Sequence, residues 1–437
     1  MNTTMEHGTM LPHFIVEPPM ALVDQIVQTC LVGLKPLQPV TIRTQMRDDL
    51  DRLWKAHAIF EADETGTVDL GTQCPVSGTY VDADVMGLFW SMALPPDTPE
   101  VSPFFKTALM PTLITLRAEV DEQEITTVTL GRLFVAPDVI RTPVHDRGLV
   151  GVLFHPSGPG PYPGVLVVGG SGGGLGWSEE MAALLASHGF AALALAYFAV
   201  ADLPDDLVQI PLEYFETALA WMRAHPVVQG ERLAVMGASY GGQLALLLGA
   251  TFSQVGAIIA YSPGSVVERG LRRGGPGPVD ESAWSYRGRP LPYLRNSVTP
   301  AQMADIFSRT PIAVTPLYLI NLADPVAVAE AAIPVENIAG PVLLISGQDD
   351  SMWPSTLMAD MVMERLRVHG HPYHDRHLSY AGAGHPLRAP YLPTTVTFVR
   401  HRIGNMMAFG GDPRQQASAN AASWLQVLAF LGAATAQ

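Results

Sequence analysis

Residues 232–250, RLAVMGASYGGQLALLLGA, place one serine between small residues at the point where an apolar run becomes a helical pattern. Leu233–Met236 has the continuous apolar character of a strand buried on both faces. In a Gly-x-Ser-x-Gly turn, the small residues let a strand pass tightly into a helix and leave the hydroxyl exposed above the sheet. Ser239 is therefore a candidate nucleophile, while the competing interpretation makes it an ordinary helix N-cap.

A nucleophilic serine needs a histidine as general base and a carboxylate that orients the histidine. VLLISGQDDSMWPS supplies a buried strand followed by Asp349 and Asp350, and LSYAGAGHPL carries His385 after another strand and a glycine-rich loop. Serine, aspartate and histidine thus occur in the order of α/β-hydrolases. We predict a triad of Ser239, Asp350 and His385, since Gly-x-x-Asp keeps the usual spacing. Asp349 is then a solvated or turn-forming neighbour, and the alternative for His385 is an ordinary loop histidine.

Backbone amides that could hold an oxyanion occur in two places. The amide of Tyr240 opens the helix after the candidate nucleophile. The glycine run VGGSGGGLGW, residues 168–177, follows an earlier strand, and its candidate donors are Ser171, Gly172 and Gly173. A nucleotide-binding loop is the rival interpretation. Gly-x-Gly-x-x-Gly fails at every register here and no Gly-Lys-Ser/Thr is present, so we do not expect a nucleotide site.

Arginines are concentrated in one part of an otherwise acidic chain. Residues 269–309 contain seven arginines and three acids. Guanidinium groups suit phosphates, so an anionic substrate group is one interpretation, and a solvated loop is an equal alternative. The candidate substrate-binding residues are Arg272, Arg273, Arg287, Arg289 and, beside the candidate acid, Trp353.

Four histidines in VHGHPYHDRH suggest a metal site at first sight: His369, His371, His374 and His377. The cluster leads into a strand, in which alternate residues face opposite sides, so four ligands would not converge. We expect a structural or surface role, with no metal and no cofactor.

Strands and helices alternate after about residue 150. Apolar strands are expected at 164–170, 340–347 and 374–381, and WSEEMAALLASHGF is expected as a helix with Ser178 as its N-cap. Alternation of this kind predicts a doubly wound, mostly parallel sheet. The Gly-, Pro- and Arg-rich segment 264–312 interrupts the pattern as an excursion.

Short alternating strands separated by turn residues characterise the part of the chain before residue 150. Examples are VTIRTQM at 40–46 and the later LITLRAEV and ITTVTLGRLFV. Many short strands without long helical patterns predict a β-sandwich. The expected domains are residues 1–145, a β-sandwich, and residues 146–437, an α/β catalytic domain.

Composition narrows the partners and the compartment. The 437 residues are 48% hydrophobic and 15% charged, and 26 basic against 41 acidic residues give a formal charge of −15. A surface this acidic disfavours nucleic acid and anionic membranes. Cys30 and Cys74 are too few for a disulfide framework, the first residues do not resemble a signal peptide, and the longest apolar run, 190–201, is too short to span a bilayer. We expect a cytoplasmic protein without a membrane span.

The chain resembles the acyl-CoA thioesterases related to bile acid-CoA:amino acid N-acyltransferase over nearly its whole length. The similar blocks include GVLVVGGSGGGLGWSEEMAALLASHGF, IPVENIAGPVLLISGQDDSMWPS, AGAGHPLRAPYLPT and, in the first half, VGLKPLQPVTIR and GTYVDADVMGLFWSM. The resemblance implies an immunoglobulin-like amino-terminal domain followed by an α/β-hydrolase domain. It also places the triad on Ser239, Asp350 and His385.

Members of this family hydrolyse acyl-CoA thioesters or transfer the acyl group to an amino acid, and the transferase branch uses cysteine as nucleophile. Here the position is Ser239. An acyl-serine is an oxyester better suited to water, so we expect hydrolysis of a small-molecule acyl thioester, carried by CoA or a carrier protein. The alternatives are an acyltransferase, another ester or lactone hydrolase, and a non-catalytic acyl-CoA-binding module.

Overall fold

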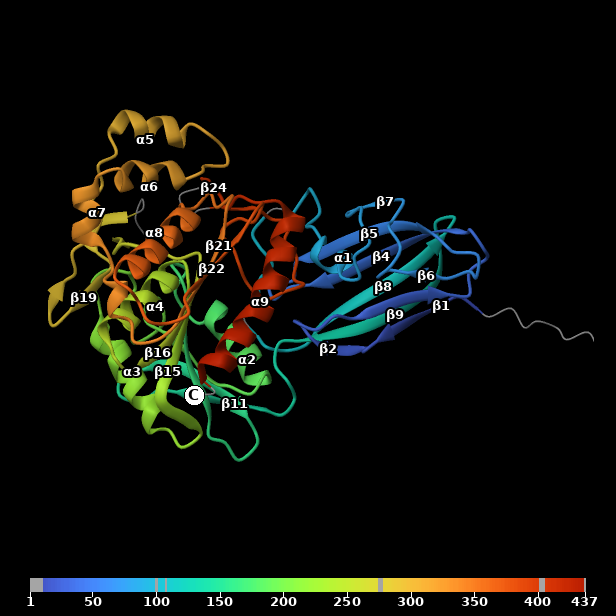
Figure 1. The fold of residues 1–437 in the computed structure, drawn as a ribbon. Helices are drawn as coiled ribbons and strands as arrows, with labels where there is room; N and C mark the ends of the chain where they lie inside the picture. The colour runs from blue at the N-terminus through green and yellow to red at the C-terminus, as the bar shows by residue number, and fades with distance from the viewer. Residues whose placement is uncertain (1–10, 99–100, 107, 274–277, 401–404, 436–437) are drawn as a thin grey trace, which may run out of the picture. The chain divides into compact units, whose positions relative to one another are not determined.

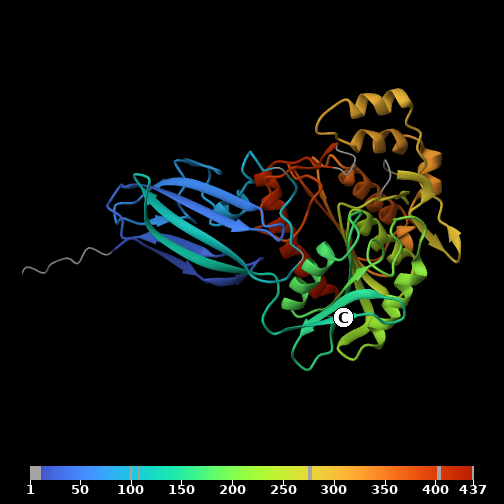
Figure 2. The ribbon, with the colours of Figure 1, turned by 180° about the vertical axis from the view of Figure 1, so that it is seen from behind.

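The computed structural model describes residues 11–98, 101–106, 108–273, 278–400 and 405–435. These residues form two compact units. The first contains the described chain up to Phe134 together with Tyr391–Val396, and the second contains Val135–Pro390 and the described chain from Thr397 onward. Figures 1 and 2 show the chain from opposite sides.

Two β-sheets make up the first unit, seen as the blue and cyan strands of Figure 1. One sheet has the order β2-β9-β8-β4-β5-β7, antiparallel except for the pair β2–β9, and the other is antiparallel with the order β1-β3-β6. In β4, alternate residues such as Val40, Ile42 and Met46 are buried, which is the pattern expected from the sequence. The elements are β1 (His13–Glu17), β2 (Met20–Leu22), β3 (Gln28–Val32), β4 (Pro39–Arg47), β5 (Leu53–Glu61), β6 (Val68–Asp69), β7 (Ser77–Gly78), α1 (Gly87–Trp90), β8 (Thr112–Val120) and β9 (Gln123–Leu133).

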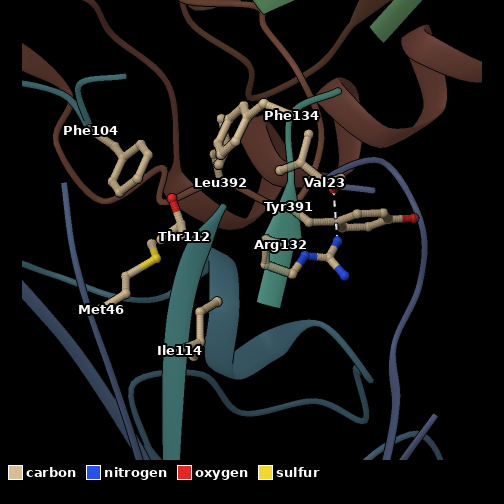
Figure 3. A pocket seen from close by; sticks show the side chains of 9 residues that line it. All are labelled: Val23, Met46, Phe104, Thr112, Ile114, Arg132, Phe134, Tyr391 and Leu392. Atoms are coloured by element: carbon tan, nitrogen blue, oxygen red, sulfur yellow. Dashed lines mark hydrogen bonds between the residues drawn. The ribbon is translucent and has the colours of Figure 1, made fainter. Parts of the chain in front are cut away.

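A small pocket in the first unit is lined by residues from distant parts of the sequence (Figure 3). Arg132 Nη2 donates hydrogen bonds to the carbonyl oxygens of Val23 and Gln25 at 2.8 and 2.6 Å. Burial lowers the pKa of Arg132 to about 10. Tyr391 and Leu392 line the same pocket. The first unit is therefore completed by a segment that follows the candidate catalytic histidine in sequence.

An eight-stranded sheet with the order β10-β11-β13-β12-β15-β16-β21-β22 forms the centre of the second unit. β11 is antiparallel to both neighbours, and the strands from β13 to β22 are parallel. The expected doubly wound, mostly parallel sheet is thus present. The strands are β10 (Val139–Val144), β11 (Val150–Pro156), β12 (Tyr162–Val168), β13 (Ala191–Ala196), β15 (Val228–Ala238), β16 (Val255–Tyr261), β21 (Val342–Gly347) and β22 (Arg376–Tyr380).

Helices cover both faces of this sheet. In Figures 1 and 2, α2 and α9 lie on one face, and α3, α4 and α8 lie on the other. β13, β16 and β21 are buried at every position, because the sheet is covered on both sides. The helices are α2 (Gly176–Ser187), α3 (Leu212–Ala224), α4 (Tyr240–Thr251), α8 (Ser355–Val368) and α9 (Pro413–Thr435).

The start of α2 differs from the sequence prediction. Leu175, not Ser178, occupies the N-cap position. Ser178 is fully buried in the first turn, and its Oγ donates to the carbonyl oxygen of Leu175 at 3.0 Å. The predicted cap is wrong because this hydroxyl is satisfied inside the helix and faces the core.

Short elements connect β16 with β21, where the sequence indicates an excursion over 264–312. Residues 274–277 of that segment lie outside the described residues. The connecting elements are β17 (Arg269–Leu271), β18 (Pro278–Ser282), β19 (Trp284–Tyr286), β20 (Arg289–Pro290), α5 (Pro300–Phe307), α6 (Thr315–Leu322), α7 (Pro325–Ala331) and η1 (Val335–Asn337). Outside this segment, β14 (Ile210–Pro211) pairs with β19, and β23 (Phe398–Arg400) pairs with β24 (Met406–Ala408). Among the described residues, no helix has the length and apolar character that crossing a bilayer would take.

Candidate active site

β15 ends at Ala238 and α4 begins at Tyr240, so Ser239 alone forms the turn between them. Its backbone has φ 57° and ψ −122°, a conformation that residues other than glycine rarely adopt. A Cβ on Gly237 would overlap the carbonyl oxygen of Gly241, so glycine is what allows the turn to close. The side chain of Ser239 makes no capping hydrogen bond to α4, which argues against the N-cap interpretation.

The side chains of Ser239, His385 and Asp350 form a continuous row. His385 Nε2 lies 3.1 Å from Ser239 Oγ, and His385 Nδ1 lies 2.8 Å from Asp350 Oδ2. Because an ionised carboxylate only accepts hydrogen bonds, Nδ1 carries the hydrogen and Nε2 is free to accept the serine proton. The side chain of Asp350 is 1% exposed and that of His385 12%. The row therefore runs from a buried acid to a partly accessible serine.

Four hydrogen bonds hold the carboxylate of Asp350. The amides of Met352 and Trp353 donate to Oδ1 at 2.9 and 3.2 Å, and Ser355 Oγ donates to Oδ2 at 2.7 Å beside the histidine. Asp349, in contrast, is exposed. The two neighbouring aspartates thus have separate environments, and only Asp350 faces the imidazole.

The loop that carries His385 is held through its backbone. The amide of His385 donates to the carbonyl oxygen of Phe409 at 3.0 Å, and Ser262 Oγ donates to the carbonyl oxygen of His385 at 2.9 Å. One residue earlier, the amide of Gly384 donates to Gln416 Oε1 on α9 at 2.8 Å. These bonds fix the position from which the imidazole reaches both partners.

A buried ion pair holds the same loop on its other side. Arg388 Nη2 lies 2.9 Å from Glu180 Oε2 on α2, and the two side chains are 15% and 4% exposed. The amide of Arg388 also donates to Asn420 Oδ1 on α9 at 3.2 Å. Helices from one face of the sheet therefore hold the histidine loop on both sides of His385.

The loop after β12 lies beside the candidate nucleophile. A Cβ on Gly170 would be 3.1 Å from Ser239 Cβ, so this backbone closely approaches the serine. The amide of Gly173 donates to the carbonyl oxygen of Gly170 at 3.2 Å within a turn. Gly173 is therefore removed from the predicted oxyanion donors, because its hydrogen is already engaged. Ser171 and Gly172 are exposed and stay candidates.

Tyr240 and Trp353 pack beneath the row. The Tyr240 hydroxyl donates to the carbonyl oxygen of Arg269 at 3.0 Å, and its ring stacks on Trp353 with centroids 5.5 Å apart. Trp353 is 2% exposed, meets the His385 ring edge-on, and donates from Nε1 to the carbonyl oxygen of Ser262 at 3.1 Å. The prediction that Trp353 binds substrate is corrected, because a side chain this buried supports the histidine and offers no surface to a ligand.

Glu268 is a buried acid that sequence reasoning missed. It is 3% exposed, and burial raises its pKa to about 8. Its amide lies 3.5 Å from Oε1 of the buried Gln243, which also accepts a hydrogen bond from Trp284 Nε1 at 2.6 Å. Within the described residues, Glu268 Oε1 and Gln243 Nε2 have no hydrogen-bond partner. Nothing in the local sequence SVVERGL distinguishes this glutamate from an exposed one.

The arginines singled out from the sequence have different surroundings. Arg272 pairs with Glu281 at 2.9 Å, and Arg273 Nη1 donates to a backbone carbonyl at 3.3 Å. Arg287 and Arg289 are exposed, the first in the turn between β19 and β20 and the second at the start of β20. The last two are therefore the guanidinium groups best placed to meet an anion in solution.

A second row of serine, histidine and aspartate joins β21, β22 and α8. Ser346 Oγ is 2.7 Å from His377 Nε2, and His377 Nδ1 is 2.9 Å from Asp360 Oδ1. Ser346 is fully buried, so this row has no accessible nucleophile. His371, from the same histidine cluster, pairs with Asp375 at 2.6 Å. No three His, Cys, Asp or Glu side chains of the described ranges are grouped so as to hold a metal ion.

Comparison with known families covers most of the chain. The sequence model described as the acyl-CoA thioester hydrolase/BAAT N-terminal region matches residues 24–146, and the one described as the BAAT/acyl-CoA thioester hydrolase C terminal matches residues 210–437. The chain belongs to this family. Its members include both thioesterases and acyltransferases.

Individual relatives are similar over nearly their full length. Peroxisomal succinyl-coenzyme A thioesterase of Mus musculus is 32% identical over 94% of this chain and 93% of that protein. Acyl-coenzyme A thioesterase 1 of Mus musculus is 33% identical over 93% of each. Acyl-coenzyme A amino acid N-acyltransferase 1 of Mus musculus is 33% identical over 96% of this chain and 97% of that protein. Among solved structures, a dienelactone hydrolase-like phosphotriesterase from metagenomic libraries matches 67% of this chain and 97% of its own, with 20% identity and a TM-score of 0.40.

Gly241→Ala tests the close packing of the turn. A Cβ there would overlap the carbonyl oxygens of Val168 and Gly169, which are backbone atoms that cannot rotate away. We expect a loss of about 1–3 kcal/mol in the free energy of unfolding, and a fall in thioesterase kcat, because relief of the overlap moves Ser239. Denaturant unfolding and steady-state kinetics measure both. Gly432→Ala is the matched control, since a Cβ there meets nothing within 4 Å. Equal behaviour of the two variants would contradict the packing argument.

Glu268→Gln tests the buried acid through the pH dependence of stability. The pKa of Glu268 rises from 4.5 to about 8 on folding, so the folded state holds a proton that the unfolded state releases. Its contribution to stability is complete below about pH 4.5 and is lost as the pH rises to about 8, with a slope of about 1.4 kcal/mol per pH unit. The stability of the variant relative to the wild type should therefore increase from pH 5 to pH 8, and thermal unfolding measures this difference. The control is Glu216→Gln, at an exposed position. If the stability of Glu268→Gln and that of the wild type changed with pH in the same way, the interpretation would be wrong.

Proposed function

We propose that this protein hydrolyses acyl-CoA, or a related acyl thioester, through an acyl-enzyme on Ser239. The observation that carries the proposal is the continuous row from Asp350 through His385 to Ser239, with distances of 2.8 and 3.1 Å. Membership in a family of acyl-CoA thioesterases and acyltransferases supports the substrate class. No cofactor enters the proposed reaction.

In the proposed reaction, Ser239 Oγ attacks the thioester carbonyl carbon while His385 Nε2 takes the serine proton. Asp350 stabilises the imidazolium that forms. The amide of Tyr240, at the amino end of α4, and the amides of Ser171 and Gly172 are the proposed oxyanion donors. Collapse of the tetrahedral intermediate breaks the carbon–sulfur bond, and the departing sulfur takes the proton of His385 and leaves as the thiol. Neutral His385 then takes a proton from water, whose oxygen attacks the acyl carbon. When the bond to Ser239 breaks, His385 returns this proton to Ser239 Oγ and the acid is released.

Transfer to an amine is the second candidate function, because one similar protein is named an amino acid N-acyltransferase. The identity of the nucleophile indicates whether hydrolysis or transfer is favoured. An acyl-serine oxyester is attacked by amines less readily than an acyl-cysteine thioester, so water is the favoured acceptor on Ser239. Hydrolysis of other esters or lactones would use the same row, and acyl-CoA binding without turnover is the least favoured alternative.

The finer architecture is also proposed. We assign residues 1–145 to an immunoglobulin-like β-sandwich, supported by its two sheets, and residues 146–437 to the catalytic domain with an excursion over 264–312. We place the protein in the cytoplasm on its low cysteine content, and the two cysteines, Cys30 and Cys74, are free thiols in the structure.

Exposed arginines near the nucleophile helix are proposed to bind the phosphates of CoA. Arg287 and Arg289 extend from the hairpin of β19 and β20, and Trp284 in β19 bonds to Gln243 on α4. Arg272 and Arg273 are the further candidates, although Arg272 would first have to leave Glu281. Guanidinium groups in these positions would add affinity for the anionic end of the substrate.

Ser239→Ala tests the proposed nucleophile. With a panel of acyl-CoAs, we expect the wild type to release equal amounts of free thiol and free acid, with and without glycine or taurine. The variant should lose at least about a thousandfold in kcat, because no acyl-enzyme forms. Thiol release and product analysis by mass spectrometry measure both quantities.

Ser308→Ala serves as the matched control, since Ser308 is an exposed serine at the end of α5. Full activity of Ser239→Ala would remove the triad from the mechanism. Conjugates with glycine or taurine in place of free acid would assign the protein to the transferase function. Bound but unconverted acyl-CoA in the wild type would support a binding module.

The double variant Arg287→Ala/Arg289→Ala tests phosphate recognition. We expect KM for acyl-CoA to rise about three- to tenfold at low salt, with kcat unchanged, because exposed charge contacts contribute modestly and are screened by salt. KM for the matching acyl-N-acetylcysteamine thioester, which has no phosphates, should not change. Arg147→Ala, at an exposed arginine outside this segment, is the control. Equal effects on both substrates would exclude a role in phosphate binding.

A further inference from the structure

Four polar contacts connect α8 to β21 and β22 near the candidate acid. They join Asp360 Oδ1 to His377 Nδ1 (2.9 Å), His377 Nε2 to Ser346 Oγ (2.7 Å), Ser346 Oγ to Thr356 Oγ1 (2.9 Å) and Thr356 Oγ1 to the carbonyl oxygen of Gly347 (3.1 Å). Ser346 is fully buried, and the side chain of His377 is 9% exposed. In the interior, each of these contacts needs a hydrogen to be favourable.

The number of hydrogens in this chain depends on the protonation of His377. Both ends of the chain, the carboxylate of Asp360 and the carbonyl of Gly347, only accept hydrogen bonds. Four contacts therefore need four hydrogens from the three groups between them. Ser346 and Thr356 supply one each, and a neutral imidazole supplies one. The count is complete only when both ring nitrogens of His377 carry hydrogen.

The same chain reaches the residues that hold the candidate catalytic acid. Thr356 follows Ser355, whose Oγ donates to Asp350 Oδ2 at 2.7 Å. Gly347, which accepts from Thr356, is the last residue of β21 and begins the turn that carries Asp350. The contacts thus fix the end of β21 and the first turn of α8, between which Asp350 lies.

We propose that His377, as an imidazolium, is a positioning residue that fixes Asp350 and through it the ring of His385. The proposal rests on the proposed catalytic function of Ser239, Asp350 and His385. When His377 loses one proton, the chain is one hydrogen short and one of its contacts opens. The start of α8 is then held less tightly, and kcat falls while substrate binding is unaffected.

The charge that faces His377 comes from Asp360. β22 packs against β21, α8 and α9. The residues of β21 include no ionisable side chain, and those of α9 include only Arg414. Arg376, next to His377 in β22, donates to Gln426. The other ionisable residues of α8 are paired elsewhere, Glu364 with Arg367 and Arg365 with Glu336.

Asp360→Asn tests the assignment without disturbing the core, because the Asp360 side chain is 65% exposed. Loss of the anion weakens the contact with His377 Nδ1, so kcat should fall about two- to fivefold while KM does not change. Glu364→Gln, one turn later on the exposed face of α8, is the matched control. An unchanged kcat, or the same fall in the control, would overturn the proposal.

Nitrogen NMR of the histidine rings tests the proton count independently of activity. The signals of His377 are assigned by comparison with His377→Gln. We expect two-proton signals under the conditions of the kinetic assay, whereas signals of a neutral ring there would overturn the proposal. If Ser239→Ala kept full activity, the proposed triad would fail, and this ring measurement would still report on the contacts of His377.

Discussion

The position of Ser239 depends on direct contact between backbone segments, which two glycines allow. Gly237 lies against Gly241, and Gly241 lies against the carbonyl oxygens at the end of β12 and the start of the following loop. Three segments are thereby joined with no side chain between them, and the strained conformation of Ser239 is maintained by its surroundings. The candidate oxyanion donors depend on the same contact, because the amide of Tyr240 and those of the loop belong to two of the joined segments.

Directed hydrogen bonds, by contrast, place the other two members of the row. The core of the second unit is apolar and fixes the strands, but Asp350 and His385 lie on loops beyond strand ends. Asp350 is held by four hydrogen bonds, and the loop of His385 is held from α2 and α9 by Glu180 and Gln416. A loop in this position can hold its side chain within hydrogen-bond distance of a partner only if the backbone groups of the loop are themselves hydrogen-bonded. Dispersion contacts alone do not fix the orientation of a side chain.

Sequence analysis can propose the candidate triad because the chemistry dictates residue types, chain order and position after a strand, and the three side chains lie in one row in the structure. It also predicts the parallel sheet, because strands buried on both faces have continuous apolar runs. It fails where the role of a residue depends on the orientation of its side chain or on contacts with residues far away in the sequence. Trp353 adjoins the acid in sequence but turns into the core, the amide of Gly173 closes a turn, and Tyr391–Val396 joins the first unit through partners far away in the chain. None of these three features can be predicted from the pattern of neighbouring residues in the sequence.

The two rows of serine, histidine and aspartate show that residue types alone do not define a catalytic row. In the first, the chain of hydrogen bonds ends at Ser239, a donor, so a neutral ring satisfies both contacts and Nε2 remains a base. In the second, Ser346 is followed by Thr356 and a carbonyl oxygen, so the serine hydrogen is directed away from the ring. The ring must then supply a hydrogen of its own. What lies beyond the serine therefore decides whether the histidine serves as a base or as a cation.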